Sequence, residues 1–391
     1  MAKVLAALSG GVDSAAAAIL LLEAGHEVAG AVLCMSPCHD KVVEAAKETA
    51  AQLGIPVFVK DCKKEFSEQI IAGFERAYLA GRTPNPCVLC NAEIKFPKLL
   101  ELADAHGYEL IATGHYAGIS NGQWTMDNGQ CGEIQPPPPP VTPPSEEGGI
   151  YIKKAKSAAR DQSYMLYRLG PDVLSRLILP LAELEKDAVR ALVKENGLTC
   201  HAAPDSSENC FLPNADYKRF IKERLVAIHG EKISEEIFSG PIISPEGEII
   251  GQHNGLYNFT IGQRKGLGLE KSFPDPVFVR KLDPETNRVF LAWGGGEFAA
   301  EFEVGELVLH IAADWKGEIR FALDCDVKIR SAAKPARARV EILNQLTMDN
   351  GQWTMENVAR VVFEERQRAI APGQSAVFYI GDLVVGGGII M

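Results

Sequence analysis

The sequence predicts an α/β protein of three parts: an N-terminal domain with a parallel sheet, a small mixed central domain, and a C-terminal antiparallel β-barrel. Short apolar runs alternate with helical patterns from Lys3 to Ala112, which is typical of a parallel sheet wrapped by helices. Beyond about residue 276, short strand-like pieces between turn residues replace the helical patterns. The length of 391 residues fits two or three domains of about 150 residues each. We place the domains at residues 1–207, 208–275 and 276–391.

The N-terminal elements follow one another in regular order. We expect strands at Lys3–Leu8, Val28–Leu33, Val57–Val59 and Leu110–Ala112, and helices that end at Glu23 or cover Lys41–Leu53, Phe66–Leu79 and Lys95–His106. In such sheets, ligands bind beyond the carboxyl ends of the strands. The loop after the first strand is therefore expected at the binding edge.

The C-terminal part shows five strand-like pieces: Pro276–Arg280, Arg288–Ala292, Val340–Leu343, Val358–Phe363 and Ser375–Ile380. Because turn residues separate them and no helical pattern intervenes, they predict a small antiparallel barrel.

Composition narrows the functional classes. The chain is 46% hydrophobic and 23% charged, as in ordinary globular proteins, and its net charge of -11 argues against non-specific coating of nucleic acid. Its longest apolar run, Ala15–Leu22, is far shorter than the roughly 20 residues that span a bilayer. With no signal-peptide pattern either, we expect a cytoplasmic protein without membrane contact. Nine cysteines with one close pair, Cys87 and Cys90, argue against a secreted disulfide framework.

A seven-residue unit is repeated in two places. Asn-Gly-Gln-Trp-Thr-Met occurs at 121–126 and 350–355, and Thr-Met-Asp-Asn-Gly-Gln at 125–130 and 347–352. The first copy continues into the proline run 136–140. We interpret residues 121–149 and 346–357 as insertions that lengthen loops at little cost in stability, with docking of a proline-binding module as the alternative for the first.

The loop Ser9–Ser14 (Ser-Gly-Gly-Val-Asp-Ser) is suited to binding phosphate. It lies between a predicted strand and helix, so it offers consecutive backbone N–H groups, and its glycines allow an anion to approach closely. It lacks the Gly-Lys-Ser/Thr ending of a Walker A loop and the third glycine of a dinucleotide fingerprint. Asp13 is expected to bind Mg²⁺ or to cap the helix.

These features resemble the PP-loop ATP pyrophosphatases, which have a Rossmann-like domain and activate a carbonyl oxygen as an adenylate. Within them, the chain is similar to the bacterial tRNA-specific 2-thiouridylases (MnmA/TrmU family) over nearly its whole length outside the insertions. The segments that carry the resemblance are Leu8–Ser14, Gly81–Cys87, Cys90-Asn91, Ile94–Phe96, Ala112–Tyr116, Asp161–Tyr164, Asp205-Ser206, Cys210-Phe211, Gly262–Gly268 and Pro372–Tyr379. By that resemblance, the ATP site is lined by Ala7, Leu8, Ser9, Gly10, Gly11, Val12, Asp13, Ser14, Leu33 and Gly114.

Three cysteines are candidates for sulfur chemistry. Prolines 84 and 86 stiffen the segment before Cys87 and Cys90, and Cys210 follows a polar turn that favours an accessible thiol. The resemblance implies that Cys90 is the nucleophile and that Cys210 carries sulfur as a persulfide. Many relatives have Asp in place of Cys87, so Cys87, Cys90 and Cys210 could instead bind a [4Fe-4S] cluster with one open iron. Both routes remain open at this point.

Two basic segments stand out from the acidic background: Tyr151–Arg160 and Lys328–Arg339 contain several Lys and Arg residues and no acidic residue. Either alone is typical of a solvated face, whereas a tRNA backbone would explain both. The resemblance implies tRNA contacts at Arg160, Asp161, Gln162, Arg330 and Ser331, and target-base contacts at Asn85, Pro86 and Cys87.

The sequence therefore predicts ATP-dependent 2-thiolation of the wobble uridine of tRNA. A sulfur-donating protein or a persulfide relay is expected to supply the sulfur. The alternatives are a PP-loop ligase or amidotransferase that acts on a small-molecule carbonyl, which needs no thiol, and a tRNA-binding protein without activity. The cysteines argue against the first alternative and the intact loop Ser9–Ser14 against the second.

Overall fold

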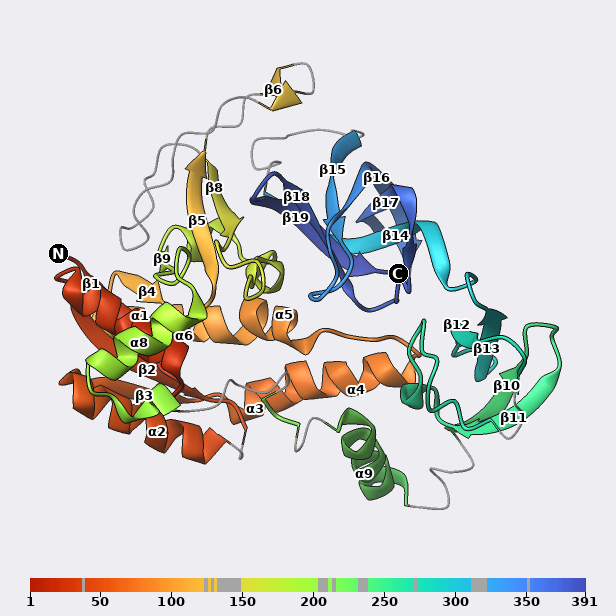
Figure 1. The fold of residues 1–391 in the computed structure, drawn as a ribbon, viewed down its shortest axis with the longest axis horizontal. Helices are drawn as coiled ribbons and strands as arrows, with labels where there is room; N and C mark the ends of the chain where they lie inside the picture. The colour runs from red at the N-terminus through yellow and green to blue at the C-terminus, as the bar shows by residue number, and fades with distance from the viewer. Residues whose placement is uncertain are drawn as a thin grey trace.

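The computed structural model describes residues 1–36, 39–122, 126–127, 130–131, 149–202, 210–212, 216–230, 238–269, 273–310, 322–349 and 352–391. Within these residues, three sheets account for the three predicted parts: a five-stranded parallel sheet, a four-stranded mixed sheet and an antiparallel barrel (Figure 1). No helix in the described part is both long and apolar enough to cross a bilayer.

The N-terminal domain confirms the predicted alternation of strands and helices. Its sheet has the order β3 (Val57–Asp61), β2 (Glu27–Cys34), β1 (Lys3–Ala7), β4 (Leu110–Ala112) and β9 (Leu177–Ile178), with all neighbours parallel. Leu5 packs on one face of β1, and Val4 and Ala6 pack on the other, so helices cover both faces. The helices α1 (Val12–Glu23) and α2 (Asp40–Leu53) follow the first two strands.

A second group of helices extends from the sheet toward the rest of the molecule. It contains α3 (Lys63–Glu65), a π-helical turn at Phe66–Ile71, α4 (Ala72–Leu79), α5 (Pro86–Cys90), a π-helical turn at Asn91–Lys95 and α6 (Phe96–His106). Figure 1 shows α4 running between the parallel sheet and the central sheet. The helix α9 (Tyr217–His229) packs against α4, where the rings of Tyr78 and Tyr217 stack at 4.5 Å.

The central sheet contains two strands that we expected in the barrel. Its order is β11 (Ile249–Asn254), β10 (Ser239–Ile243), β13 (Arg288–Trp293) and β12 (Val277–Asp283). Strand β13 pairs with β10 in parallel, and Val289 shares a core with Ile242. The assignment of the first two strand-like pieces to the barrel was therefore wrong, because a strand pattern does not specify its pairing partner.

The C-terminal barrel closes from six antiparallel strands. Strand β14 pairs with both ends of the row β17, β16, β15, β18 and β19, so these six strands form a closed ring. The strands are β14 (Phe298–Leu309), β15 (Ala322–Lys328), β16 (Ala336–Asp349), β17 (Gln352–Arg368), β18 (Ser375–Ile380) and β19 (Leu383–Ile390). A hairpin of β5 (Ala117–Gly122) and β8 (Gly149–Lys154) joins β19 through Lys153 and Leu383.

The same residues of the repeated unit form a strand pair in both copies. Asp127 pairs with Gln130 between β6 (Met126–Asp127) and β7 (Gln130–Cys131), and Asp349 pairs with Gln352 between β16 and β17. Asn-Gly stands between the paired residues each time, which is the strongest short hairpin signal and could have been recognised in the sequence. The proline run lies outside the described residues.

Candidate active site at the carboxyl edge of the parallel sheet

The loop after β1 forms a cradle at the N-terminus of α1. Gly11 is the residue before the helix, and Gly10 has a φ of +70°. A Cβ at Gly10 would lie 2.4 Å from the Cβ of Ala45, so only glycine allows this approach to α2. The Ser9 N–H donates to Ser14 Oγ (3.1 Å), and Ser14 Oγ donates to the Gly11 carbonyl (2.9 Å). This rigid turn with a helix N-terminus suits an anion.

The other residues expected to bind ATP gather at the same edge. Leu33 lies near the carboxyl end of β2. Gly114 follows β4, and a Cβ there would be 2.7 Å from the carbonyl carbon of Asp13. The chain after β4 therefore passes directly against the first turn of α1. The residues present fit a bound ATP because the loop offers its backbone N–H groups at the N-terminus of α1, where no side chain caps the helix.

Asp13 has a partner that the sequence did not indicate. Lys186, the first residue of α8 (Lys186–Glu195), places Nζ 2.7 and 2.8 Å from the two carboxylate oxygens, and its side chain is only 12% exposed. The Tyr116 hydroxyl donates to Asp13 Oδ1 at 2.7 Å. The expected cap is wrong, because Gly11 occupies that position and α1 has no side-chain cap. Oδ1 accepts two hydrogen bonds, whereas Oδ2 accepts one and keeps a lone pair, so the Mg²⁺ role of Asp13 stays a prediction.

The extended geometry predicted before the cysteines is confirmed at Asn85. Asn85 is extended (φ −111°, ψ 92°), and Pro86 begins α5. Cys87 is half-buried, while Cys90 is buried and its Sγ donates to Met35 Sδ at 3.7 Å. Met35 follows β2 directly, so Cys90 lies at the same edge of the sheet as the loop. Burial raises the pKa of Cys90 to about 12, so this thiol is protonated at neutral pH.

Cys210 is exposed, as the polar turn predicted. Its neighbour Phe211 is buried, with ring centroids 5.7 Å from Phe66 and 5.3 Å from Phe74. Negative charge on Cys210 or Cys87 raises the pKa of Cys90 further, so the three sulfurs share one electrostatic environment. Asp205 and Ser206 lie outside the described residues.

The three cysteines do not form a ready metal-binding set. Among the residues with described positions, no group of three or more His, Cys, Asp or Glu is placed to hold an ion. These residues therefore do not fit a [4Fe-4S] cluster in this arrangement. Cys34, Cys62 and Cys325 are buried, consistent with core positions.

Lys95 and His115 lie in segments that carry the family resemblance, but the sequence analysis gave neither residue a role. Lys95 ends the π-helical turn after Cys90, and its charge lowers the pKa of both Cys90 and His115. Burial holds the pKa of His115 well below its usual value, so the ring is neutral, and Nδ1 lies 2.8 Å from Thr113 Oγ1. Lys95 thus brings a positive charge to the edge that holds the thiol.

The expected tRNA-binding residues divide into internal and exposed groups. Asp161 accepts from Ser163 Oγ (2.8 Å), and Gln162 Oε1 accepts from the Tyr116 N–H (2.8 Å). Their side chains therefore hold the protein together, whereas Arg160, Arg330 and Ser331 are exposed.

The two basic segments meet at the barrel. Lys328 is 9% exposed, and its Nζ lies 5.8 Å from the centre of the Tyr164 ring. Burial lowers the pKa of Lys328; the charge of Asp161 opposes this shift, and the charge of Lys154 in the other segment adds to it. Lys154 lies 4.7 Å from the Tyr379 ring. The two basic segments, which are far apart in the sequence, therefore lie close together in the structure, so neither is an isolated solvated face.

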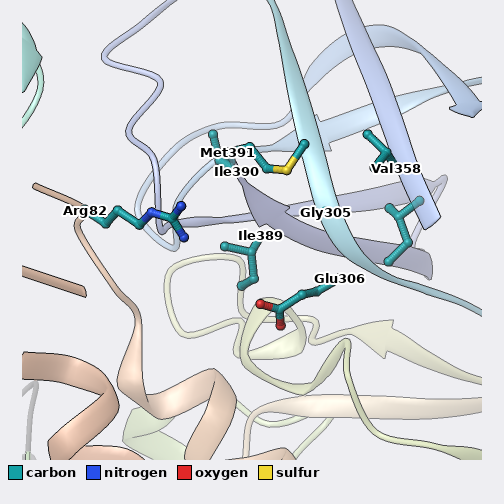
Figure 2. A pocket seen from close by; sticks show the side chains of 8 residues that line it. Arg82, Gly305, Glu306, Val358, Ile389, Ile390 and Met391 are labelled. Carbon is teal, nitrogen blue, oxygen red and sulfur yellow. The ribbon is translucent and has the colours of Figure 1, made fainter. Parts of the chain in front are cut away.

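A cavity lies away from this edge, between the barrel and the segment that leads to α5. Its volume is about 390 Å³, and Figure 2 shows its lining: Arg82, Gly305, Glu306, Leu307, Val358, Ile389, Ile390 and Met391. It contains no residue of the Ser9–Ser14 loop and no cysteine.

Family models match all three parts of the chain. They are described as a tRNA methyl transferase HUP domain (residues 2–214), a tRNA methyl transferase PRC-barrel domain (230–293) and an aminomethyltransferase beta-barrel domain (312–390). The second match ends at residue 293, where β13 ends.

Curated relatives match over nearly the full length. The tRNA-specific 2-thiouridylase MnmA of Carboxydothermus hydrogenoformans is 38% identical over 99% of this chain and 97% of its own, and that of Clostridioides difficile is 36% identical over 99% and 98%. Among solved structures, the U34-tRNA thiolase NcsA from Methanococcus maripaludis with its [4Fe-4S] cluster is 19% identical, with a TM-score of 0.34 over 58% of this chain and 67% of that chain. Likeness at that level says nothing about the cofactor of this chain. The full-length matches, however, show that the chain belongs to the MnmA family of tRNA-specific 2-thiouridylases.

Proposed function

We propose that this protein catalyses ATP-dependent 2-thiolation of the wobble uridine of tRNA in the cytoplasm. One observation carries the proposal: the phosphate cradle at Ser9–Ser14 and the thiol of Cys90 lie at one edge of one sheet. Activation of a carbonyl oxygen and its displacement by sulfur need these two groups side by side. The curated relatives are named tRNA-specific 2-thiouridylases, which supports the thiolation of a tRNA uridine.

In the first step, the uracil O2 attacks the α-phosphorus of ATP, and pyrophosphate leaves. Backbone N–H groups of the cradle and the N-terminus of α1 would hold the phosphates, while Gly10 and Gly114 let the cradle pack closely against α2 and the chain after β4. Lys186 brings a cation to the first turn of α1 and is suited to the charge that develops on pyrophosphate. Mg²⁺ would arrive on the phosphates with its waters, because Mg²⁺ seldom needs a complete protein cage.

In the second step, sulfur displaces AMP from C2. A persulfide on Cys210 would deliver its terminal sulfur to C2, the Cys90 thiolate would attack the remaining sulfur of Cys210, and a Cys90–Cys210 disulfide would form as AMP leaves with the former O2. A thiol reductant must then restore both cysteines, and a sulfur-donating protein must reload Cys210. The exposure of Cys210 supports its loading by a partner, and the shared environment of the two sulfurs supports the exchange.

The tRNA would reach the site across the exposed side chains of Arg160, Arg330 and Ser331. Asn85 to Cys87 would meet the base, because this segment is extended and lies directly before the helix that carries Cys90. A wobble uridine stands in a single-stranded loop, so it can turn outward at low cost.

The test is mass analysis of the wobble uridine after incubation of the protein with tRNA, ATP, a metal chelator that spares Mg²⁺, and a persulfide-generating donor. We expect 2-thiouridine together with AMP and pyrophosphate, and no 2-thiouridine from Cys90→Ala. ADP and inorganic phosphate as the primary products would contradict adenylation. If a small-molecule carbonyl supports ATP turnover, and Cys90→Ala leaves this turnover intact, the protein would instead be a ligase or amidotransferase.

A further inference from the structure

The segment Gly81–Asn85 joins α4 to α5 and touches all three parts of the molecule; we call it the cysteine arm. Gly81, with φ of +66°, lies so close to the central sheet that a Cβ would be 3.0 Å from Leu282 Cβ. Thr83 contacts the barrel: its N–H donates to the Pro372 carbonyl at 2.7 Å. Its carbonyl accepts from the side-chain amide of Gln374 at 2.8 Å. The position of α5 therefore depends on elements distant in the sequence.

The far end of the arm is tied to the same barrel strand through a second route. Asn91, just after Cys90, donates to the Met165 carbonyl at 3.0 Å, and Asn85 Nδ2 lies 3.6 Å from Met165 Sδ. The adjacent Tyr164 hydroxyl donates to the Ser375 carbonyl at 2.8 Å. Gln374 and Ser375, neighbours at the start of β18, thus hold both sides of α5.

The barrel packs closely against the arm at Arg82 and Thr83. A Cβ at Gly373 would lie 2.9 Å from Arg82 Cβ and 3.0 Å from the Thr83 nitrogen. The Arg82 side chain borders a cavity of about 390 Å³ together with the barrel residues Ile389 and Ile390 (Figure 2). The side-chain bond from Gln374 adds a second directional contact to Thr83, beside the backbone bond from Thr83 to Pro372.

We propose that Gln374 is a positioning residue for sulfur transfer: its amide holds Thr83 so that the barrel sets the place of Cys90 at the edge of the parallel sheet. The inference rests on the proposed thiolation. Gln374 contacts neither the cradle nor a thiol, so it acts through the arm. Misplacement of a reacting group by about 1 Å can cost about 100-fold in rate.

The test compares Gln374→Met, which keeps the length of the side chain and removes the donor, with Gln374→Lys, which supplies a donor of similar reach. We expect Gln374→Met to lower kcat for thiolation about 10- to 100-fold. Its Kd for tRNA and its rate of pyrophosphate release should remain within about twofold, because the cradle is untouched. Gln374→Lys should recover a large part of kcat.

Alkylation of Cys90 by iodoacetamide, followed by peptide mass analysis, reports the position of the arm without any turnover. It should be faster in Gln374→Met than in wild type and in the control Gln367→Met, which removes a barrel glutamine that donates to the Glu365 carbonyl (2.9 Å) within its own strand. If the wild type makes no 2-thiouridine but Cys90 alkylation responds, the proposed function fails and the positioning role stands. Unchanged kcat and alkylation in Gln374→Met, or an equal loss of kcat, tRNA affinity and melting temperature in both Gln374 variants, would overturn the inference.

Discussion

Asp13 and Lys186 form an ion pair whose removal should affect stability and ATP chemistry separately. Asp13→Asn leaves the Lys186 ammonium, 12% exposed, without its carboxylate, whereas Lys186→Met leaves a carboxylate that still accepts from Tyr116 and faces the N-terminus of α1. We therefore expect Asp13→Asn to be the more destabilising change, and the double variant to be more stable than the sum of the single effects predicts.

The burial of the pair sets the expected size. Removing one partner of a fully buried pair costs about 3–5 kcal/mol, and exposed pairs contribute about 0–1 kcal/mol. Because the side chain of Asp13 is 36% exposed and that of Lys186 is 12% exposed, we expect about 2 kcal/mol for Asp13→Asn and about 1 kcal/mol for Lys186→Met. The coupling energy of the double-mutant cycle should be about 1–2 kcal/mol.

Urea denaturation of the four proteins measures the free energy of unfolding, and pyrophosphate release measures adenylation. The control is the cycle at Lys47 and Glu44, an exposed pair at 2.8 Å, where the coupling should be below about 0.5 kcal/mol. The double variant at the cradle should regain stability while pyrophosphate release stays low. A coupling no larger than that of the control, or restored pyrophosphate release, would refute this account of the pair.

Three further outcomes are expected. Since burial raises the pKa of Cys90 to about 12, its alkylation in the ligand-free enzyme should be slow at pH 8 and rise about tenfold per pH unit up to pH 10; a flat profile would contradict the burial argument. Cys87→Ser should keep most of the thiolation activity with a persulfide donor. Activity that changes in proportion to iron content would instead support the [4Fe-4S] cluster. Replacing residues 123–148 by a two-residue turn should leave thiolation within about twofold, because Gly122 and Gly149 pair directly across the β5–β8 hairpin; a large loss of tRNA affinity would show that the insertion takes part.

A fourth outcome concerns the barrel surface. Arg330→Glu should weaken tRNA binding and reduce the slope of log Kd against log salt by about 1, as measured by fluorescence anisotropy. An unchanged slope would show that Arg330 is a solvated surface residue that does not contact a phosphate of the tRNA.

The order of elements in the N-terminal domain could be predicted because local patterns encode it. Apolar alternation and the glycine pair define β1, its loop and α1 without reference to any distant residue. Barrel strand β19 was missed for a physical reason: its sequence LVVGGGII holds three consecutive glycines, which weaken a strand pattern. The structure requires them for close approach, since a Cβ at Gly387 would lie 2.6 Å from the Ala376 carbonyl oxygen.

Partner choice could not be predicted from local patterns. Lys186 lies 173 residues from Asp13, and nothing around it in the sequence indicates an acidic partner. One weak sign exists, because a lysine in the first turn of a helix opposes the helix dipole and therefore needs another reason to be there. The same limit explains why β12 and β13 were assigned to the barrel.

The motif residues at 161–164 and 372–379 acquire a different meaning once their contacts are known. Gln162 bonds both to the N–H of Tyr116 through Oε1 and to its carbonyl through the backbone, and the hydroxyl of Tyr116 bonds to Asp13. Residues beside the exposed Arg160 are thus two bonded steps from the cradle, while Gln374 is one bonded step from the cysteine arm. The segments 161–164 and 372–379, which carry the family resemblance, therefore also connect the barrel and the chain beside Arg160 to the two elements that hold the adenylating loop and the thiol.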